Sequence, residues 1–185
     1  MVNTYVALFR GINVGGNNVL PMKELVALLE GLGSRDVETY IQSGNAVFRN
    51  EEDARTLSKR IRAEIRRSHG FEPLVMLLRP EELEKAMESN PFPEAEPEAK
   101  TLHLYFPVST PTDPDLDALD VARSDRERFA LEDGVFYLHA PDGIGRSRLA
   151  ARVEKGLGIP VTGRNWRTVR KVVEMARRCG PRHQP

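Results

Sequence analysis

The sequence predicts an α+β protein of two ferredoxin-like (βαββαβ) halves with antiparallel sheets, followed by a C-terminal helix. The same order of strand and helix patterns occurs twice along the chain. Phe48 and Phe136 each follow a turn glycine within a hairpin, and Gly70 and Gly158 each end a helix; both pairs are separated by the same 88 positions. An internal duplication explains this spacing, and two unrelated α+β units with common hairpin chemistry are the alternative.

The first half shows each element of the pattern in turn. Residues 5–9 form an apolar run of strand-forming residues, and apolar side chains then recur at helical spacing from Pro21 onward. Ser43-Gly44 marks a hairpin turn. Acidic residues open the next helix, and Gly70 closes it. The expected elements are strand 5–9, helix 21–32, strands 36–42 and 45–48, helix 51–70 and strand 74–78.

A proline-rich segment separates the two halves. Residues 90–100 contain three prolines and predict a linker without regular structure, so we expect domains at 1–90 and 100–185. After a short helix from Pro80, the expected elements are strand 101–106, helix 116–121, strands 128–131 and 135–139, helix 146–157, strand 159–162 and a last helix that ends at Gly180-Pro181. The expected core contains Phe9, Leu25, Leu29, Ile61, Val75, Leu104, Phe136, Val153 and Trp166.

Four segments carry a resemblance to a known family. They read, in order, YVALFRGINVGG followed by a PMKEL helix start, TYIQSGNAVF, DGIGRSRL and TGRNWRTVRKV. Together they resemble the bacterial family catalogued as domain of unknown function sixteen-ninety-seven, over nearly the whole chain. The resemblance implies a fold of ferredoxin-like α+β units. It implies no reaction, so no catalytic residues follow from it.

The composition is that of a soluble globular protein. Of 185 residues, 40% are hydrophobic and 29% charged, and the formal net charge of zero argues against a dedicated nucleic-acid binder. The apolar runs are far shorter than the ~20 residues that a membrane span needs. We recognise no signal peptide, and the sequence has only one cysteine, Cys179. We therefore expect a cytoplasmic location and no membrane partner.

The first candidate site is the glycine-rich stretch after the first strand. Backbone N–H groups of a loop that contains Gly11, Gly15 and Gly16 can turn toward an anion beside Arg10, close to a helix start. In a ferredoxin-like unit this loop and the hairpin turn lie at one edge of the sheet. The expected ligand-binding residues of this site are Arg10, Gly11, Asn13, Gly15, Gly16, Gln42, Ser43 and Asn45. The alternative is that these segments are connections only.

The second candidate site is basic and lies in the second half. Glycines precede Arg146 and Ser147 before one helix, and Gly163 precedes Arg164 and Asn165 before the last helix. We therefore expect Arg146 and Arg164, like Arg10, to border a glycine turn. Asn165 is also an ordinary helix cap. We expect at least two of the arginines Arg10, Arg146 and Arg164 to line one cleft with Asn13 and Asn45.

Catalytic, metal and cofactor motifs are not recognised in the sequence. The four histidines are scattered, no metal-ligand spacing occurs, and the Gly-Lys-Ser/Thr of a Walker A loop is missing. We therefore expect no cofactor and no metal, and leave open whether the protein is an enzyme.

The leading functional interpretation is binding of an anionic small molecule, either a phosphate-bearing metabolite or a nucleotide. An RNA-binding protein that uses ferredoxin-like sheets is less favoured, because aromatics make up only 6% of the chain. An enzyme acting on a phosphorylated metabolite is the third interpretation. No sequence feature fixes an oligomeric state.

Overall fold

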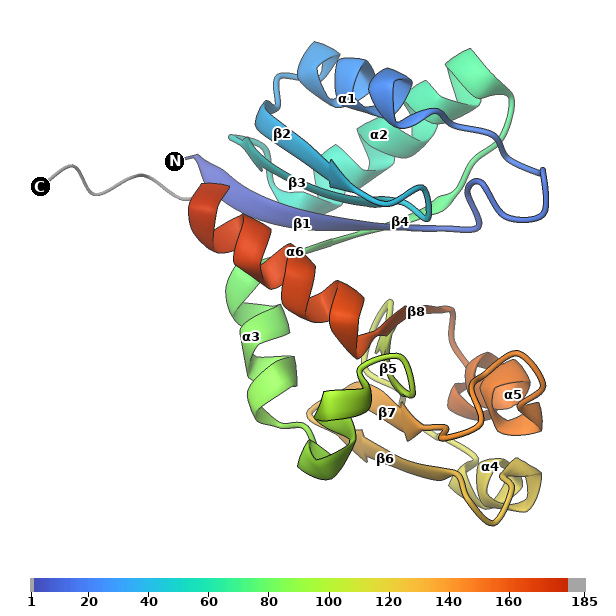
Figure 1. Ribbon diagram of the computed structural model, residues 1–185. Coiled ribbons are helices and arrows are strands. Elements are labelled where there is room, and N and C mark those ends of the chain that lie inside the picture. Colours follow the sequence, from blue (N-terminus) through green and yellow to red (C-terminus); the bar gives the residue numbers. More distant parts are fainter. Residues whose placement is uncertain (1, 180–185) are drawn as a thin grey trace, which may run out of the picture. The chain divides into compact units, whose positions relative to one another are not determined.

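The computed structural model describes residues 2–179 and contains two four-stranded antiparallel sheets, in the orders β2-β3-β1-β4 and β6-β7-β5-β8 (Figure 1). This confirms the predicted α+β fold of two ferredoxin-like halves with a C-terminal helix. The first half contains β1 (Asn3–Arg10), α1 (Met22–Gly31), β2 (Arg35–Tyr40), β3 (Asn45–Asn50), α2 (Ala54–His69) and β4 (Leu74–Leu78). The remaining elements are α3 (Pro80–Glu88), η1 (Pro93–Glu98), β5 (Leu102–Pro107), α4 (Leu116–Ala122), β6 (Arg128–Glu132), β7 (Val135–His139), α5 (Arg148–Leu157), β8 (Val161–Asn165) and α6 (Trp166–Cys179).

The backbone packs into two compact units. Among the described residues, the first unit consists of residues 2–84 and 171–179, and the second unit is Lys85–Arg170. The boundaries therefore fall inside α3 and α6, whereas the sequence drew them at residues 90–100. The predicted domains 1–90 and 100–185 stay a prediction.

The two units share a cross-strand aromatic pair at the same place in the sheet. Tyr5 of β1 lies opposite Phe48 of β3, and Tyr105 of β5 lies opposite Phe136 of β7. The ring centroids are 6.1 and 5.9 Å apart, respectively. Gly70 and Gly158 also match, because each caps its helix in the left-handed conformation. These equivalences are those that a duplication predicts.

The central strand of the first unit is buried on both faces. Tyr5, Ala7 and Phe9 join the core under α1 and α2, whereas Val6 and Leu8 point to the opposite face and are fully buried as well. This explains why β1 reads as an uninterrupted apolar run and does not alternate. In the second unit, Leu119 of α4 and Val153 of α5 pack on the sheet with Phe136. Every residue of the expected core is buried, which confirms that prediction.

Two local predictions are wrong. The strand predicted to run to residue 42 ends at Tyr40, because Ile41 has φ +49° and leaves the extended region. Residues 93–98 form a 3₁₀-helix instead of an irregular linker. Pro93 stands in its first turn, where no N–H is needed, and Phe92 and Ala95 are buried there.

The end of the last helix cannot be compared with the prediction, because Gly180-Pro181 lies outside the described residues. Within residues 2–179, no helix is long and apolar enough to cross a membrane.

We predict that Gly44→Ala destabilises the fold far more than Gly16→Ala. Both glycines have φ +78°, so both substitutions carry a backbone cost of about 1–2 kcal/mol. A Cβ on Gly44 would also lie 2.7 Å from Phe9 Cβ and Ile12 Cδ1, whereas Gly16 has open space around it. Overpacking should raise the total cost for Gly44 to about 2–5 kcal/mol in chemical denaturation. Equal losses of stability in the two variants would contradict this close packing.

Candidate functional site

The loop between β1 and α1 is a small hairpin. Val14 and Asn17 form an isolated β-bridge, with Asn17 N–H donating to Val14 O at 3.1 Å. Gly15 and Gly16 have φ +59° and +78°, the positive values that a tight two-residue hairpin turn of this kind requires. Figure 1 shows this loop extending from the end of β1 before the chain returns to α1. The glycines therefore give the loop a defined shape.

Asn13 connects this hairpin to its surroundings. Its side-chain Nδ2 donates to Leu20 O at 2.9 Å and to Gln42 O at 2.8 Å, and its Oδ1 accepts from Leu20 N at 2.8 Å. Asn18 Nδ2 donates to Gly11 O at 2.9 Å and closes the base of the loop. Both amide hydrogens of Asn13 are engaged, so this side chain holds the loop and the neighbouring turn together.

The β2–β3 turn packs against the end of β1, as the ferredoxin-like topology predicts. Phe9 N–H donates to Gly44 O at 2.9 Å. Asn45 is fully buried, and its Nδ2 donates to Tyr40 O at 3.1 Å. The expected meeting of loop 11–18 with turn 42–45 is therefore present. Asn45 belongs to the interior of this turn, whereas Gln42 and Ser43 are exposed at its tip.

This end of the first unit combines the cation Arg10 with several exposed apolar side chains. Arg10 is exposed at the last position of β1. Val14 and Val19 of the loop are 62% and 58% exposed, and Ile41 of the turn is 47% exposed. A surface of this kind can hold a molecule that has both a charged group and an apolar body.

The Asp142–Ser147 loop of the second unit precedes α5, as predicted. Ser147 Oγ accepts from Ala150 N at 2.9 Å and caps the helix, while Arg146 is exposed. Asp142 forms an ion pair with Arg126 at 2.5 Å. Capping occupies the Ser147 hydroxyl, and Arg146 is an exposed cation of this loop.

Arg164 does not border a glycine turn, contrary to the sequence interpretation. Gly163 lies inside β8, and its hydrogen atom is needed there because a Cβ would lie 2.9 Å from Tyr105 Cε1. Asn165 is the expected helix cap and accepts from Thr168 N at 2.9 Å. Burial lowers the pKa of Arg164 to about 10, which leaves the guanidinium charged at neutral pH.

The predicted cleft of two or more arginines stays a prediction. Arg10 belongs to the first unit, and Arg146 and Arg164 belong to the second. Within the second unit, Arg146 is exposed on a loop and Arg164 is partly buried on a strand.

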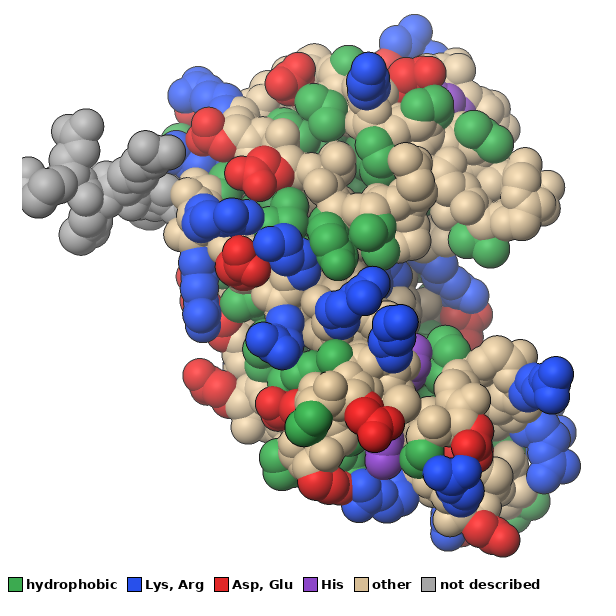
Figure 2. Space-filling model, viewed as in Figure 1, with side chains coloured by type: hydrophobic (Ala, Val, Ile, Leu, Met, Phe, Trp, Pro, Cys, Tyr) green, Lys and Arg blue, Asp and Glu red, His purple; other side chains and the backbone are tan. Residues whose placement is uncertain are grey.

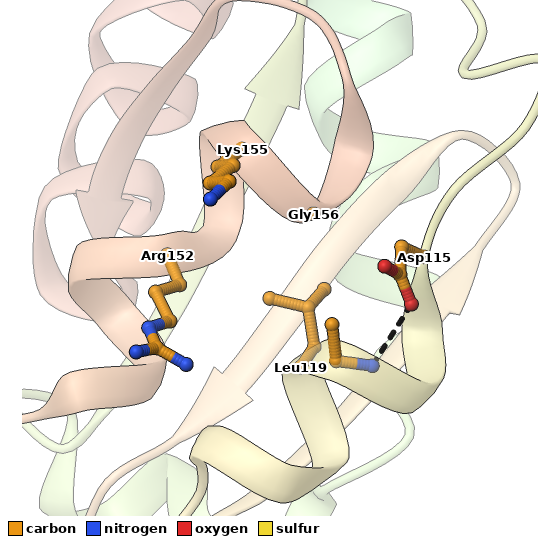
Figure 3. Close-up of a pocket in the computed structure, with 6 residues that line it drawn as sticks. Asp115, Leu119, Arg152, Lys155 and Gly156 are labelled. Carbon is orange, nitrogen blue, oxygen red and sulfur yellow. Dashed lines mark hydrogen bonds between the residues drawn. The ribbon is translucent and has the colours of Figure 1, made fainter.

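Sequence reasoning missed a cavity between α4 and α5. It has a volume of about 200 Å³ and is lined by Asp115, Ala118, Leu119, Arg152, Lys155 and Gly156 (Figure 3). A glycine inside a helix, at position 156, was the available signal, because a helix normally avoids glycine unless another element packs against it.

The described part of the chain contains no cluster of metal-ligand side chains and no reactive thiol. No group of three or more His, Cys, Asp or Glu side chains among residues 2–179 could hold a metal ion. Cys179 is buried, its Sγ lies 3.6 Å from Asp36 O, and burial raises the pKa of its thiol. This cysteine is therefore a poor nucleophile at neutral pH.

The family model described as Protein of unknown function (DUF1697) matches residues 2–137, from the start of the first unit to β7. The chain belongs to this family. Its structure is similar to that of the conserved bacterial protein SP0830 from Streptococcus pneumoniae, with a TM-score of 0.72 and 24% identity. The alignment covers 95% of this chain and 99% of the other, and the likeness establishes the fold. No curated protein matches the sequence.

We predict that His103 makes the protein less stable in mild acid. His103 is only 7% exposed on β5, and burial lowers its pKa, opposed by a hydrogen bond to the Lys100 backbone. As the pH falls below about 6.5, the unfolded chain binds a proton that the folded protein resists. The free energy of unfolding should therefore decrease between pH 7 and pH 5.

Urea denaturation at several pH values measures this slope, and His103→Leu is the test variant. Its slope should be smaller than that of the wild type. The slope should not vanish, because burial also lowers the pKa of His139. An unchanged slope in His103→Leu would rule out His103 as the source.

Proposed function

We propose that the protein binds a small anionic ligand, a phosphate-bearing metabolite or a nucleotide, where loop 11–18 meets turn 42–45. Arg10 supplies the positive charge, and its planar fork suits phosphate or carboxylate. Gly11, Gly15 and Gly16 keep the neighbouring backbone open to a ligand. The exposed side chains of Gln42 and Ser43 add polar contacts.

The observation that carries the proposal is the set of hydrogen bonds made by Asn13. An exposed connection needs no such support for stability, yet this amide holds the loop to both Leu20 and Gln42. A loop fixed before binding loses less conformational freedom when a ligand arrives, and this favours affinity. The arrangement is therefore that of a preorganised binding loop.

The conformation of Ile41 supports the same location. A β-branched residue at φ +49° is strained by about 1–3 kcal/mol, and strain of this kind concentrates at ligand sites. Here it presents an apolar side chain at the turn adjoining the Arg10 strand end. The pairing of an exposed apolar group with a cation favours a ligand with an apolar or ring-shaped part, such as a nucleotide.

The sheet surfaces favour the small ligand over RNA. RNA-binding sheets of this topology present exposed aromatic side chains on which bases stack. Here the corresponding face of β1 carries Val6 and Leu8, which are fully buried, and Tyr137 of β7 is buried with its hydroxyl donating to Ala86 O at 2.7 Å. We propose the exposed loops as the binding region, in a cytoplasmic protein. Within the second unit, a separate set of candidate ligand contacts consists of Arg146, Ser147, Arg164 and Asn165.

We predict that Arg10→Ala weakens binding of the ligand by at least about tenfold, or 1.4 kcal/mol. Nucleotides, sugar phosphates and inorganic phosphate are screened by thermal shift, and the best one is titrated by calorimetry. Asn13→Ala should weaken the same ligand, because it releases the loop from Gln42.

Arg35→Ala is the matched control. Arg35 is an exposed arginine of the same unit whose ion pair with Glu51, at 3.6 Å, is exposed to solvent, so its removal should change stability little. The proposal is wrong if Arg10→Ala binds the ligand as tightly as Arg35→Ala does.

A further inference from the structure

The second unit contains a cationic groove that is separate from the loop site. It lies between α4 and α5, with a volume of about 200 Å³. In Figure 3, Arg152 and Lys155 project from α5 on one side, and Asp115 stands at the start of α4 on the other. Leu119 lies between them. The groove thus has two positive groups, one carboxylate and an apolar floor.

Close packing of the two helices fixes the shape of the groove. Asp115 N–H donates to Gly156 O at 2.7 Å, which joins the start of α4 to the last turn of α5. A Cβ on Gly156 would lie 2.5 Å from Leu119 Cγ, so only glycine permits this approach. The floor of the groove is therefore part of the rigid core, because Leu119 is fully buried.

The two cations of the groove form no ion pair with any of the described residues. Arg152 and Lys155 are both exposed, and among residues 2–179 neither makes an ion pair or a side-chain hydrogen bond. By contrast, Arg123 and Arg126 of the same unit are each paired with an aspartate. Figure 2 shows several Lys and Arg side chains gathered over α5. Two cations on one face of a helix, without a carboxylate partner, attract an anion.

The Asp115 carboxylate determines which chemical group of the ligand fits on the α4 side of the groove. Its Oδ1 accepts from Ala118 N at 2.9 Å and caps α4, and its other oxygen can accept a further hydrogen bond. A hydroxyl group suits this position, because a second negative charge would be repelled. The volume of about 200 Å³ suits a ligand with a short carbon body.

We propose that this groove is a binding site for a small hydroxylated phosphate ester, with the phosphate on Arg152 and Lys155 and a hydroxyl on Asp115. Arginine provides a planar pair of donors and lysine a compact charge, the combination that holds a terminal phosphate. The short carbon body lies over Leu119 and Gly156. This site is independent of the loop site of the first unit.

The test uses glycerol 3-phosphate, inorganic phosphate and glycerol as probes of the full chain. Backbone amide signals are followed by two-dimensional NMR during titration into the millimolar range. Glycerol 3-phosphate should shift the amides of residues 115–119 and 152–156 in a saturable way. Inorganic phosphate should shift the same amides with lower affinity, and glycerol should shift none.

The double variant Arg152→Ala and Lys155→Ala should bind glycerol 3-phosphate at least about tenfold more weakly. The matched control is Arg148→Ala, which removes an exposed arginine one turn earlier on α5 that does not line the groove, and it should leave the affinity unchanged. Asp115→Asn keeps a capping residue but removes the negative charge. This variant should bind inorganic phosphate more tightly, and its preference for glycerol 3-phosphate over inorganic phosphate should be smaller.

The proposal is overturned if the amides of the groove do not shift, or if the double variant and Arg148→Ala lose affinity equally. Equal weakening would mean a diffuse attraction to the helix. Arg10→Ala, which changes the loop site of the first unit, should leave the NMR shifts of the groove unchanged. The proposal for the groove and the proposal for the loop site can therefore fail separately.

Discussion

The pairing register of each central strand is the constraint on which the rest of the structure depends. Tyr5 opposite Phe48, and Tyr105 opposite Phe136, fix which side chains of β1 and β5 point toward the helices. A slip of one residue would reverse every side chain, because the period of a strand is two. Since Val6 and Leu8 are buried as completely as their neighbours, a slipped β1 would still present apolar side chains to both faces of the sheet, and burial alone would not penalise the slip. The shapes of the packed side chains must therefore set the register, and each sheet has one aromatic pair that fixes it.

The elements of the fold could be predicted from sequence because their signals are local. The Asp53 cap, the Gly70 cap and the Asp133-Gly134 turn act through neighbours in the chain. The errors came from tertiary contacts. Gly163 looked like a turn residue but lies in a strand against Tyr105, and the burial of Phe92 and Ala95 accompanies an ordered turn in a segment whose prolines indicated a linker.

The candidate sites show the same contrast between what the sequence predicts and what depends on tertiary contacts. The meeting of loop 11–18 with turn 42–45 followed from topology alone, since a ferredoxin-like unit brings these segments to one edge. The roles of Asn13 and Asn45 did not follow, because an amide that binds a ligand and one that holds a loop look alike in a sequence. The groove beside α5 was invisible for a related reason. Arg152 and Lys155 read as solvated surface until Asp115 is brought against Gly156.

The division of α6 between the two units has a consequence for protein synthesis. Domains usually fold in the order in which they leave the ribosome. Here the first unit includes the part of α6 from Lys171, where the Cys179 thiol meets Asp36 O and Arg178 approaches Glu38. All of the second unit, Lys85–Arg170, is translated before this piece exists. The first unit, although its synthesis begins first, is therefore completed only after the whole second unit has been translated.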